Sequence, residues 1–380
     1  MKFIHTADWH LGRILFGVHL VDDQEYILNE IEKIIKKTGP DFIIIAGDVY
    51  DRAVPPPSAV KLLDEFLNNC IKKLKTTVII IAGNHDSPER LGFASGLLEN
   101  QGVYIRSSVF NDYSVTTFTD QDGDVDIFAV PYAEPVVIRE RMNDETLSDH
   151  NVAMKAILDE IRDNNKTENR KILISHAFVA GGNETESERP LSAGGSGSVD
   201  IQAFEGFDYV ALGHLHRAQK AGKESIRYSG SILPYSFEEG KREKSVTLVT
   251  IDNEGNSDTE LIPLIPKRKF RTIEGTMEEI LSETTELSDD YIQVILRDKG
   301  PVLDAMGKLR GIFPNILHIE RPYLTYDGDN KIMNKDHRKL GETDLFSLFF
   351  KEVTGEDAEK PVMEKFNEIL DDYKKTKRDA

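Results

Sequence analysis

Histidines and carboxylates of the kinds that bind metal ions are concentrated in five short segments of the sequence. Most of these segments directly follow an apolar run of the kind that forms a buried strand, and α/β folds usually place ligands at the carboxyl ends of strands. Five such clusters are difficult to assemble by chance, so the sequence predicts a site for two metal ions. In chain order the segments are Asp8-Trp9-His10, Gly47-Asp48, Gly83-Asn84-His85-Asp86, Ser175-His176 and Gly213-His214-Leu215-His216.

Two neighbouring metal ions would support hydrolysis of a phosphodiester. That reaction needs an activated water, compensation of the charge on the phosphoryl oxygens and help for the leaving oxygen, and ions roughly 3.5 to 4 Å apart supply the first two. Asp48 is the candidate for a carboxylate that reaches both ions. Asp8 and His10 are two residues apart, so in an extended segment both side chains lie on one side and can reach one ion. His214 and His216 repeat that spacing.

The remaining members of the clusters complete the predicted site. Asn84 offers a neutral oxygen and His176 an imidazole, and a ligand set without thiolates suits manganese, iron or zinc better than calcium. His85 is then left as the candidate general acid for the leaving oxygen. Either Asp51 or Asp86 could orient it, and the sequence does not choose between them.

Composition and charge narrow the class of protein. A chain of 380 residues with 39% hydrophobic residues predicts two or three globular domains. The formal net charge of -19 argues against a protein that coats nucleic acid through its overall charge. Two basic runs are local exceptions, each either a solvated surface or a contact to phosphates: Lys241-Arg242-Glu243-Lys244 and Lys267-Arg268-Lys269-Phe270-Arg271.

We expect a cytoplasmic protein that makes no contact with a membrane. No apolar stretch approaches the roughly 20 residues needed to span a bilayer, and the first residues lead into a strand instead of a signal peptide. The single cysteine, Cys70, lies on the apolar side of a helical pattern, which predicts an inert core residue. The absence of any internal disulfide fits a reducing compartment.

The order of apolar runs and helical patterns predicts an α/β fold. Continuous apolar runs at 42–46 and 78–82 alternate with helical patterns, and further strands are expected at 127–130, 172–175, 209–212 and 245–251. Together they predict a two-sheet sandwich flanked by helices. Residues 181–197 are rich in glycine, serine and glutamate, which is typical of a long loop, either functional and near the site or merely a surface loop.

Changes in pattern divide the chain into three parts, residues 1–266, 267–340 and 341–380. The second part should form a smaller α/β domain, with strands at 291–296 and 316–319 and a helix between them. The third part should form two amphipathic helices. These helices either pack back on the same chain or dock onto a partner.

The order of the five motifs resembles that of the calcineurin-like metallophosphoesterases. Within that superfamily, residues 4–13 and 228–237 resemble the nuclease subunits of bacterial SbcCD complexes. The resemblance implies the two-sheet metallophosphoesterase fold and a manganese-dependent exonuclease and hairpin endonuclease that acts on DNA ends. It also implies an SMC-like ATPase partner of the SbcC type, a homodimer within a heterotetramer, and a location at the nucleoid.

Family roles can be carried over motif by motif. The resemblance implies that Asp48 bridges two ions, that His85 is the transition-state histidine, and that 267–340 is a DNA-capping domain while 341–380 binds the partner's coiled coil. Candidate DNA contacts are Arg13, Lys267, Arg268 and Lys269. The implied ligands are Asp8, His10, Asp48 and His216 for one ion, and Asp48, Asn84, His176 and His214 for the other.

Two other functions remain open at this stage. The same metal centre serves small-molecule phosphodiesterases and phosphatases, because function depends on what surrounds the site. Such an enzyme would not need the two segments that follow residue 266. A scaffold that tethers DNA with its partner ATPase, without needing catalysis, is the third possibility, and the intact ligand set argues against it.

Overall fold

The computed structural model describes residues 1–188, 197–283, 289–298, 300, 302–322, 342–354 and 357–378. It divides into two compact units, Met1–Arg271 and Thr272–Ala380, which are described separately below. The predicted three-part division at residues 266 and 340 stays a prediction, and residues 323–340 of the predicted second part lie outside the described residues.

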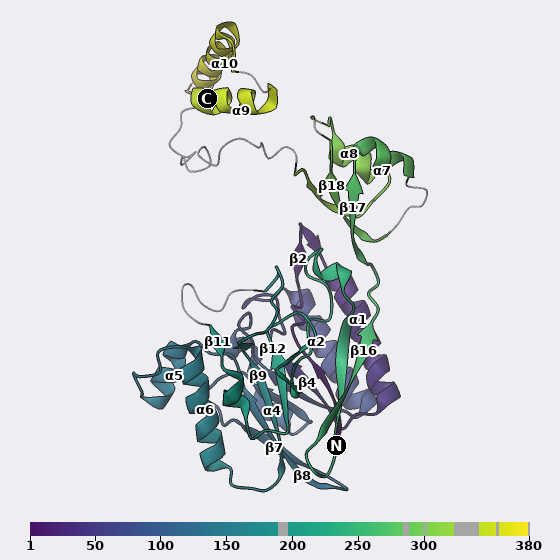
Figure 1. Ribbon diagram of the computed structural model, residues 1–380, viewed down its shortest axis with the longest axis vertical. Helices are drawn as coiled ribbons and strands as arrows, with labels where there is room; N and C mark the ends of the chain where they lie inside the picture. The colour runs from purple at the N-terminus through teal and green to yellow at the C-terminus, as the bar shows by residue number, and fades with distance from the viewer. Residues whose placement is uncertain are drawn as a thin grey trace. The chain divides into compact units, whose positions relative to one another are not determined.

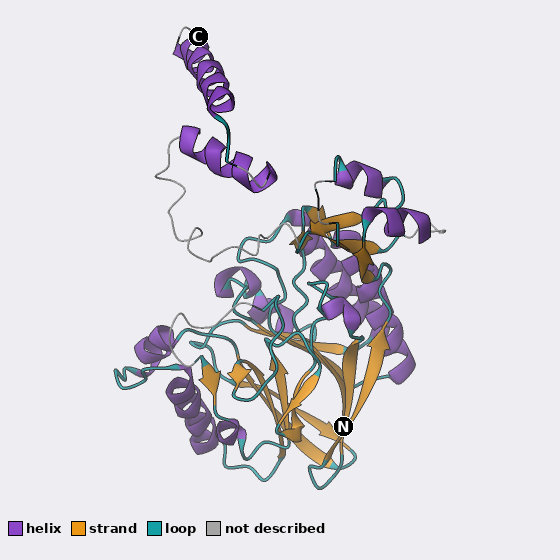
Figure 2. Cartoon of the chain, turned by 45° about the horizontal axis from the view of Figure 1, so that its top comes forward, coloured by secondary structure: helices purple, strands orange, loops and turns teal. Residues whose placement is uncertain are grey.

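The first unit contains two six-stranded sheets that pack face to face (Figures 1 and 2). The first sheet has the order β16-β15-β1-β4-β5-β6. Strands β1, β4, β5 and β6 are parallel, β15 is antiparallel to β1, and β16 is antiparallel to β15. Its strands are β1 (Lys2–Thr6), β4 (Phe42–Ala46), β5 (Thr77–Ile81), β6 (Val103–Arg106), β15 (Lys244–Ile251) and β16 (Ser257–Leu264).

The second sheet has a similar plan, with four parallel strands and an antiparallel strand at each edge. Its order is β13-β14-β12-β9-β8-β7. The strands are β7 (Ser114–Asp120), β8 (Gly123–Val130), β9 (Arg170–His176), β12 (Tyr209–Gly213), β13 (Gln219–Ala221) and β14 (Lys223–Tyr228).

The apolar runs form strands because they are buried on both faces. All five residues of β4 are buried, and alternate positions such as Ile44 and Ala46 face a core shared with Ile172 and Ile174 of β9. Helices cover the outer faces of the sandwich (Figure 2). The long helices of this unit are α1 (Val21–Thr38), α2 (Pro57–Asn69), α5 (Pro135–Met142) and α6 (His150–Asn164). The predicted α/β two-sheet sandwich is therefore confirmed.

Short elements connect these layers. Cys70, at the start of the π-helical turn η1 (Cys70–Leu74), is fully buried, as predicted for a core residue. The remaining short elements of the first unit are β2 (Ile14–Leu15), β3 (Val18–His19), α3 (Pro88–Leu91), α4 (Ser95–Glu99), β10 (Phe178–Val179), β11 (Ser198–Val199), η2 (Ile201–Phe204) and η3 (Glu239–Lys241).

The second unit contains a three-stranded sheet in the order β17-β18-β19, with a small apolar core that includes Ile292 and Leu309. Its elements are β17 (Phe270–Gly275), α7 (Met277–Glu283), β18 (Tyr291–Leu296), α8 (Ala305–Arg310), β19 (Ile316–Glu320), α9 (Glu342–Thr354) and α10 (Lys360–Arg378). The rings of Phe346 in α9 and Phe366 in α10 stack with centroids 3.9 Å apart. Among the described residues, no helix combines the length and apolar character needed to cross a membrane.

Candidate metal centre

The five motif loops leave the carboxyl ends of neighbouring parallel strands in both sheets. Asp8 follows β1, Asp48 follows β4 and Asn84 follows β5 in the first sheet. In the second sheet, His176 ends β9 and His214 follows β12. Because the carboxyl ends of parallel strands meet at one edge, the two sheets bring all five loops to one place.

The backbone of these loops is held in an unusual conformation. Asp8, His10, Asp48 and His214 have φ angles of 53°, 45°, 48° and 109°. Residues with side chains rarely adopt positive φ, and each such residue costs of order 1–3 kcal/mol unless its surroundings enforce it. Hydrogen bonds between loops provide that enforcement, because the amide of Asp8 donates to the carbonyl of Gly47 (3.1 Å) and that of His10 to Asp48 (2.9 Å).

Two motif glycines allow the loops to approach closely. Gly47 has φ +90°, and a Cβ there would lie 2.3 Å from Nδ1 of His176. A Cβ on Gly213 would lie 1.8 Å from the carbonyl oxygen of Ala46, at the end of β4 in the other sheet. The glycines are therefore required by the close packing of one ligand-bearing loop on another.

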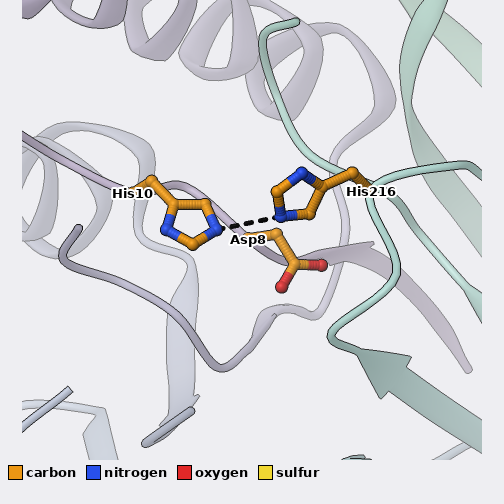
Figure 3. Close-up of side chains that lie close together, drawn as sticks. All are labelled: Asp8, His10 and His216. Carbon is orange, nitrogen blue, oxygen red and sulfur yellow. Dashed lines mark hydrogen bonds between the residues drawn. The ribbon is translucent and has the colours of Figure 1, made fainter. Parts of the chain in front are cut away.

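His10 and His216 face each other through their Nε2 atoms, which are 3.0 Å apart, with Asp8 beside them (Figure 3). Two nitrogens that each lie about 2.1 Å from one ion, at right angles, are themselves about 3.0 Å apart. The pair thus has the spacing of adjacent ligands to a common cation. Nδ1 of His10 has no hydrogen-bond partner among the described residues.

A second pair of ligand atoms has the same spacing. Nε2 of His176 lies 3.0 Å from Oδ1 of Asn84, and Nδ1 of the same ring faces the carbonyl of Ala46 at 2.9 Å. The carbonyl fixes the proton on Nδ1 and leaves Nε2 as the ligand atom. Oδ2 of Asp48 lies 3.6 Å from this nitrogen and 3.7 Å from Nε2 of His10, so this oxygen lies between the two pairs.

His214 is held next to both groups of ligands. Its amide donates to the carboxylate of Asp8 at 3.0 Å, and its ring lies 5.5 Å, centroid to centroid, from that of His176. The three groups of converging histidine and carboxylate atoms among the described residues do not include His214. The assignment of His214 as a ligand accordingly stays a prediction, as do the individual assignments of the other ligands.

The predicted general acid, His85, is oriented by a backbone group. Its Nδ1 lies 2.8 Å from the carbonyl oxygen of Asp51, and its amide donates to Oδ1 of Asp48 at 2.8 Å. The carboxylate of Asp86 instead accepts from three backbone amides, those of Val49, Tyr50 and Gly83. Asp51 therefore orients the ring, through its main chain, and Asp86 ties two motif loops together.

Burial sets the protonation of the site. Burial and the neighbouring carboxylate of Asp48 raise the pKa of Asp8 well above its ordinary value. Burial lowers the pKa of His10, His176 and His214, so these imidazoles are neutral at pH 7, which metal ligation requires. Two buried carboxylates surrounded by neutral histidines form a donor set that fits divalent cations.

A cleft of about 510 Å3 opens beside these ligands. It is lined by Arg13, Asp51, Arg52, Asn84, His85 and Glu188, among others. The predicted DNA contacts differ in their surroundings. Arg13 donates to Asp51 at 2.7 Å and Arg268 to Asp23 at 2.8 Å, whereas Lys267 and Lys269 are exposed. Contact of these four residues with DNA stays a prediction.

Comparisons with known proteins agree with this architecture. Residues 1–218 match the family described as calcineurin-like phosphoesterase, and residues 266–354 match one described as type 5 capsule protein repressor C-terminal domain. The chain is 35% identical to the SbcD subunit of nuclease SbcCD from Staphylococcus epidermidis and 36% identical to its counterpart from Staphylococcus saprophyticus, in each case over 97% of this chain and 98% of the relative.

The chain belongs to the SbcD family of calcineurin-like phosphoesterases. Among solved structures, a dimetal phosphatase from Danio rerio aligns with a TM-score of 0.39 and 11% identity, over 70% of this chain and 99% of that one. As a member of the SbcD family, the chain is a metal-dependent phosphodiesterase. All seven predicted ligands and His85 lie within residues 1–218.

Sequence reasoning missed two residues of this SbcD family member that contact the site, Glu239 and Lys244. They form a buried ion pair, 2.5 Å between Nζ and Oε2, directly behind His216. Burial would raise the pKa of Glu239, but Lys244 and a hydrogen bond from His216 hold it well below its ordinary value. The sequence signals were their position just after residues 228–237, the segment that resembles the family, and for Lys244 its place in the basic run 241–244.

Proposed function

We propose that this chain is the nuclease subunit of an ATP-gated complex that processes DNA ends in repair and recombination. It would act as a double-strand exonuclease and hairpin endonuclease, hold two manganese ions, and work with an SbcC-type ATPase in the cytoplasm, at the nucleoid. Two relatives named as nuclease subunits, each matched over nearly its whole length, support the proposal.

The observation that carries the proposal is the position of His85 on the wall of the cleft, beside the converging ligand atoms. One ion would be held by Asp8, His10, Asp48 and His216, and the other by Asp48, Asn84, His176 and His214. When bound, the two ions activate water and compensate the charge on the phosphoryl oxygens. Nothing in that chemistry protonates the leaving oxygen.

His85 is the residue available for that proton. The carbonyl of Asp51 accepts from Nδ1 of His85, so Nε2 points away from Asp51. In the protonated ring both nitrogens carry a hydrogen, so Nε2–H is available as a second donor. Nε2–H would donate to the departing 3′ or 5′ oxygen of the cut strand. The ion pair of Arg13 with the Asp51 carboxylate steadies the loop that carries this carbonyl.

We assign the contact with the ATPase to α9 and α10. Leu345, Phe349 and Ile369 of these helices are 38%, 59% and 59% exposed, an apolar content that suits a coiled-coil partner. Residues 267–340 would cap the DNA. A partner that supplies ATP-gated binding of DNA also accommodates the net charge of -19, because the nuclease chain need not hold the duplex by its own charge.

The proposed complex also contains a second copy of this chain, in contact with the first. Phe93 and Leu97, next to and within α4, are 81% and 75% exposed, although side chains of this size are usually buried. We assign these residues to contact with a second copy of the chain, which would place two nuclease subunits and two ATPase subunits in one heterotetramer.

Cleavage of a hairpin duplex tests the function. The purified chain is combined with its SbcC-type ATPase, ATP and Mn²⁺, and a labelled hairpin is followed on a denaturing gel, with Asp48→Ala as the inactive control. Wild type should cut and then shorten the hairpin. Absence of cleavage, together with rapid hydrolysis of cyclic nucleotides, would instead assign the chain to small-molecule phosphodiesterases. Normal DNA repair in cells carrying only Asp48→Ala would indicate a scaffold.

A further inference from the structure

Behind His216 lies a buried polar cluster centred on the Glu239 carboxylate. Oε1 of Glu239 lies 3.2 Å from Nδ1 of His216 and accepts from the hydroxyl of Thr185 at 3.1 Å. Oε2 accepts from Nζ of Lys244 at 2.5 Å. Glu239 and Lys244 are only 1% and 7% exposed. Burying a charged carboxylate is costly even when several donors surround it. Its location next to one histidine therefore calls for a functional reason.

The carboxylate determines which nitrogen of His216 carries the proton. Nδ1 of the ring faces both Glu239 and the hydroxyl oxygen of Ser187, at 2.6 Å, and the Ser187 hydroxyl in turn donates to Glu239. Nδ1 must therefore be the donor, which leaves the lone pair on Nε2. That atom is the one that faces Nε2 of His10 at 3.0 Å.

Lys244 holds the main chain of the same residue. Its Nζ donates to the carbonyl oxygen of His216 at 2.9 Å and to the hydroxyl of Ser231 at 2.8 Å. On the other side, the amide of His216 donates to Oε1 of Glu188 at 2.7 Å. The amide, carbonyl and ring of His216 are thus each fixed by a charged side chain.

From this geometry we propose that Glu239 and Lys244 are positioning residues, which hold His216 in the tautomer and orientation needed to bind one of the two divalent cations. The inference rests on the metal centre of the proposed function and adds a requirement for a specific ion pair outside the five motifs. Partners of this kind behind metal-binding histidines typically change metal affinity by about 10–100-fold.

Two variants separate positioning from a merely structural role. In Glu239→Gln, the single neutral amide oxygen can replace the carboxylate for either Lys244 or the Nδ1–H of His216, and the other group keeps only its remaining neutral acceptors. In Glu239→Leu/Lys244→Met, an apolar pair of similar size replaces the ion pair, a change that is often neutral or stabilising for folding. Glu238→Gln is the matched control, because Glu238 is a neighbouring carboxylate paired with Arg242 at 3.1 Å.

The readout is uptake of Mn²⁺ by the full chain, measured by calorimetry after chelation, with thermal denaturation of the metal-free proteins to confirm folding. Wild type and Glu238→Gln should bind two ions. Both test variants should bind one ion with wild-type affinity and the other about 10–100-fold more weakly. Folded variants that bind both ions as wild type does, or that lose affinity for both ions equally, would overturn this inference alone. A wild-type chain that takes up no Mn²⁺ would overturn the proposed function with it.

Discussion

Side chains at the centre depend on partners that lie outside the motifs containing them. His5 is one such partner, because it lies outside the five motifs, in the strand before Asp8, and its side chain contacts the second sheet. Its Nδ1 lies 3.0 Å from the hydroxyl of Tyr209, and its Nε2 lies 3.1 Å from the carbonyl oxygen of Leu212. One neutral imidazole therefore links the strand that leads to Asp8 with the strand that leads to His214.

Acid should destabilise the fold through His5. Burial lowers the pKa of His5 to about 3, against 6.5 when the chain is unfolded. Between these values the unfolded chain binds the extra proton, so the free energy of unfolding should fall by about 1 kcal/mol for each pH unit below roughly 6. In His5→Gln, which cannot titrate, this part of the slope should be missing. Urea denaturation of the metal-free proteins at pH 7 and pH 5 measures the difference, and parallel pH dependences would contradict it.

Substitution of His85 and substitution of Asp48 should have different effects on metal binding and turnover. His85→Ala removes the proton donor but none of the seven predicted ligands, so Mn²⁺ uptake should persist while turnover falls by about 10²–10⁴-fold. Asp48→Ala removes the oxygen that lies between both groups, so uptake itself should be lost. Calorimetry and single-turnover DNA cleavage on the same preparations distinguish the two. Normal cleavage by His85→Ala would remove its assignment as general acid.

Residue types at strand ends could be predicted to converge, but their supporting partners could not. Asp8 and Asp48 follow apolar runs that form neighbouring parallel strands of one sheet, so their convergence is expected, and His176 ends a similar run in the other sheet. Glu239 and Lys244 are ordinary charged residues in the sequence, where the expected location is the surface. Lys244 begins β15, which returns to pair with β1, and Glu239 lies in the short turn η3 just before that strand. This long-range pairing has no local signal.

At the scale of elements, the centre requires two sheets to approach more closely than side chains normally allow. Gly213 ends β12 in one sheet and meets the end of β4 in the other. The approach brings Ala46 and His176 within hydrogen-bonding distance, 2.9 Å. Packing of the sheets and geometry of the ligands are thus determined together.

Gly213→Ala should damage both stability and metal binding. The added methyl would lie 1.8 Å from the carbonyl oxygen of Ala46, so backbone must shift, at a cost of about 1–3 kcal/mol or more. Gly96→Ala in α4 is the matched control, because a Cβ there has no atom within 4 Å, and it should be neutral or stabilising by up to about 1 kcal/mol. Urea denaturation and Mn²⁺ calorimetry test the pair, and equal behaviour of the two variants would refute the steric argument.

The central parallel strands were predictable and the edge strands were not. The predicted run at 42–46 coincides with β4, because a strand buried on both faces is continuously apolar. The residues of β16, Ser257–Leu264, are exposed or half-buried except for Leu264, and β13 has only three residues, so neither presents the apolar face that a periodic signal needs. The antiparallel pairing of β15 with β1, and of β16 with β15, also depends on register, which local sequence does not specify.

At the scale of the whole molecule, the proposed assembly places its contacts at exposed apolar side chains. Those of α9 and α10 and those at Phe93 and Leu97 lie in different compact units. Isolated exposed apolar residues are common on protein surfaces, so the assignment of each group to a partner needs a test of its own.

Leu97→Glu should prevent the proposed self-association. A carboxylate placed in an apolar contact between two copies would be desolvated twice, once on each copy, so a dimer should become a monomer at micromolar concentration. Leu303→Glu is the control, because Leu303 is 86% exposed in the other compact unit. Light scattering after gel filtration gives the mass of each variant. A wild-type chain that runs as a monomer would remove the homodimer from the proposal.

The ligand loops come from both sheets of the sandwich, and the last two strands of the first sheet come late in the sequence. β1 leads to the first predicted ligands. Its antiparallel neighbour β15 is formed by residues 244–251, which follow the last histidine motif in the sequence. A nascent polypeptide therefore lacks part of the ligand set, and the strand beside β1, until more than half of its 380 residues have been translated. Truncated products of a stalled ribosome that end before residue 214 should accordingly lack a complete set of ligands, a consequence of the order of the motifs in the chain.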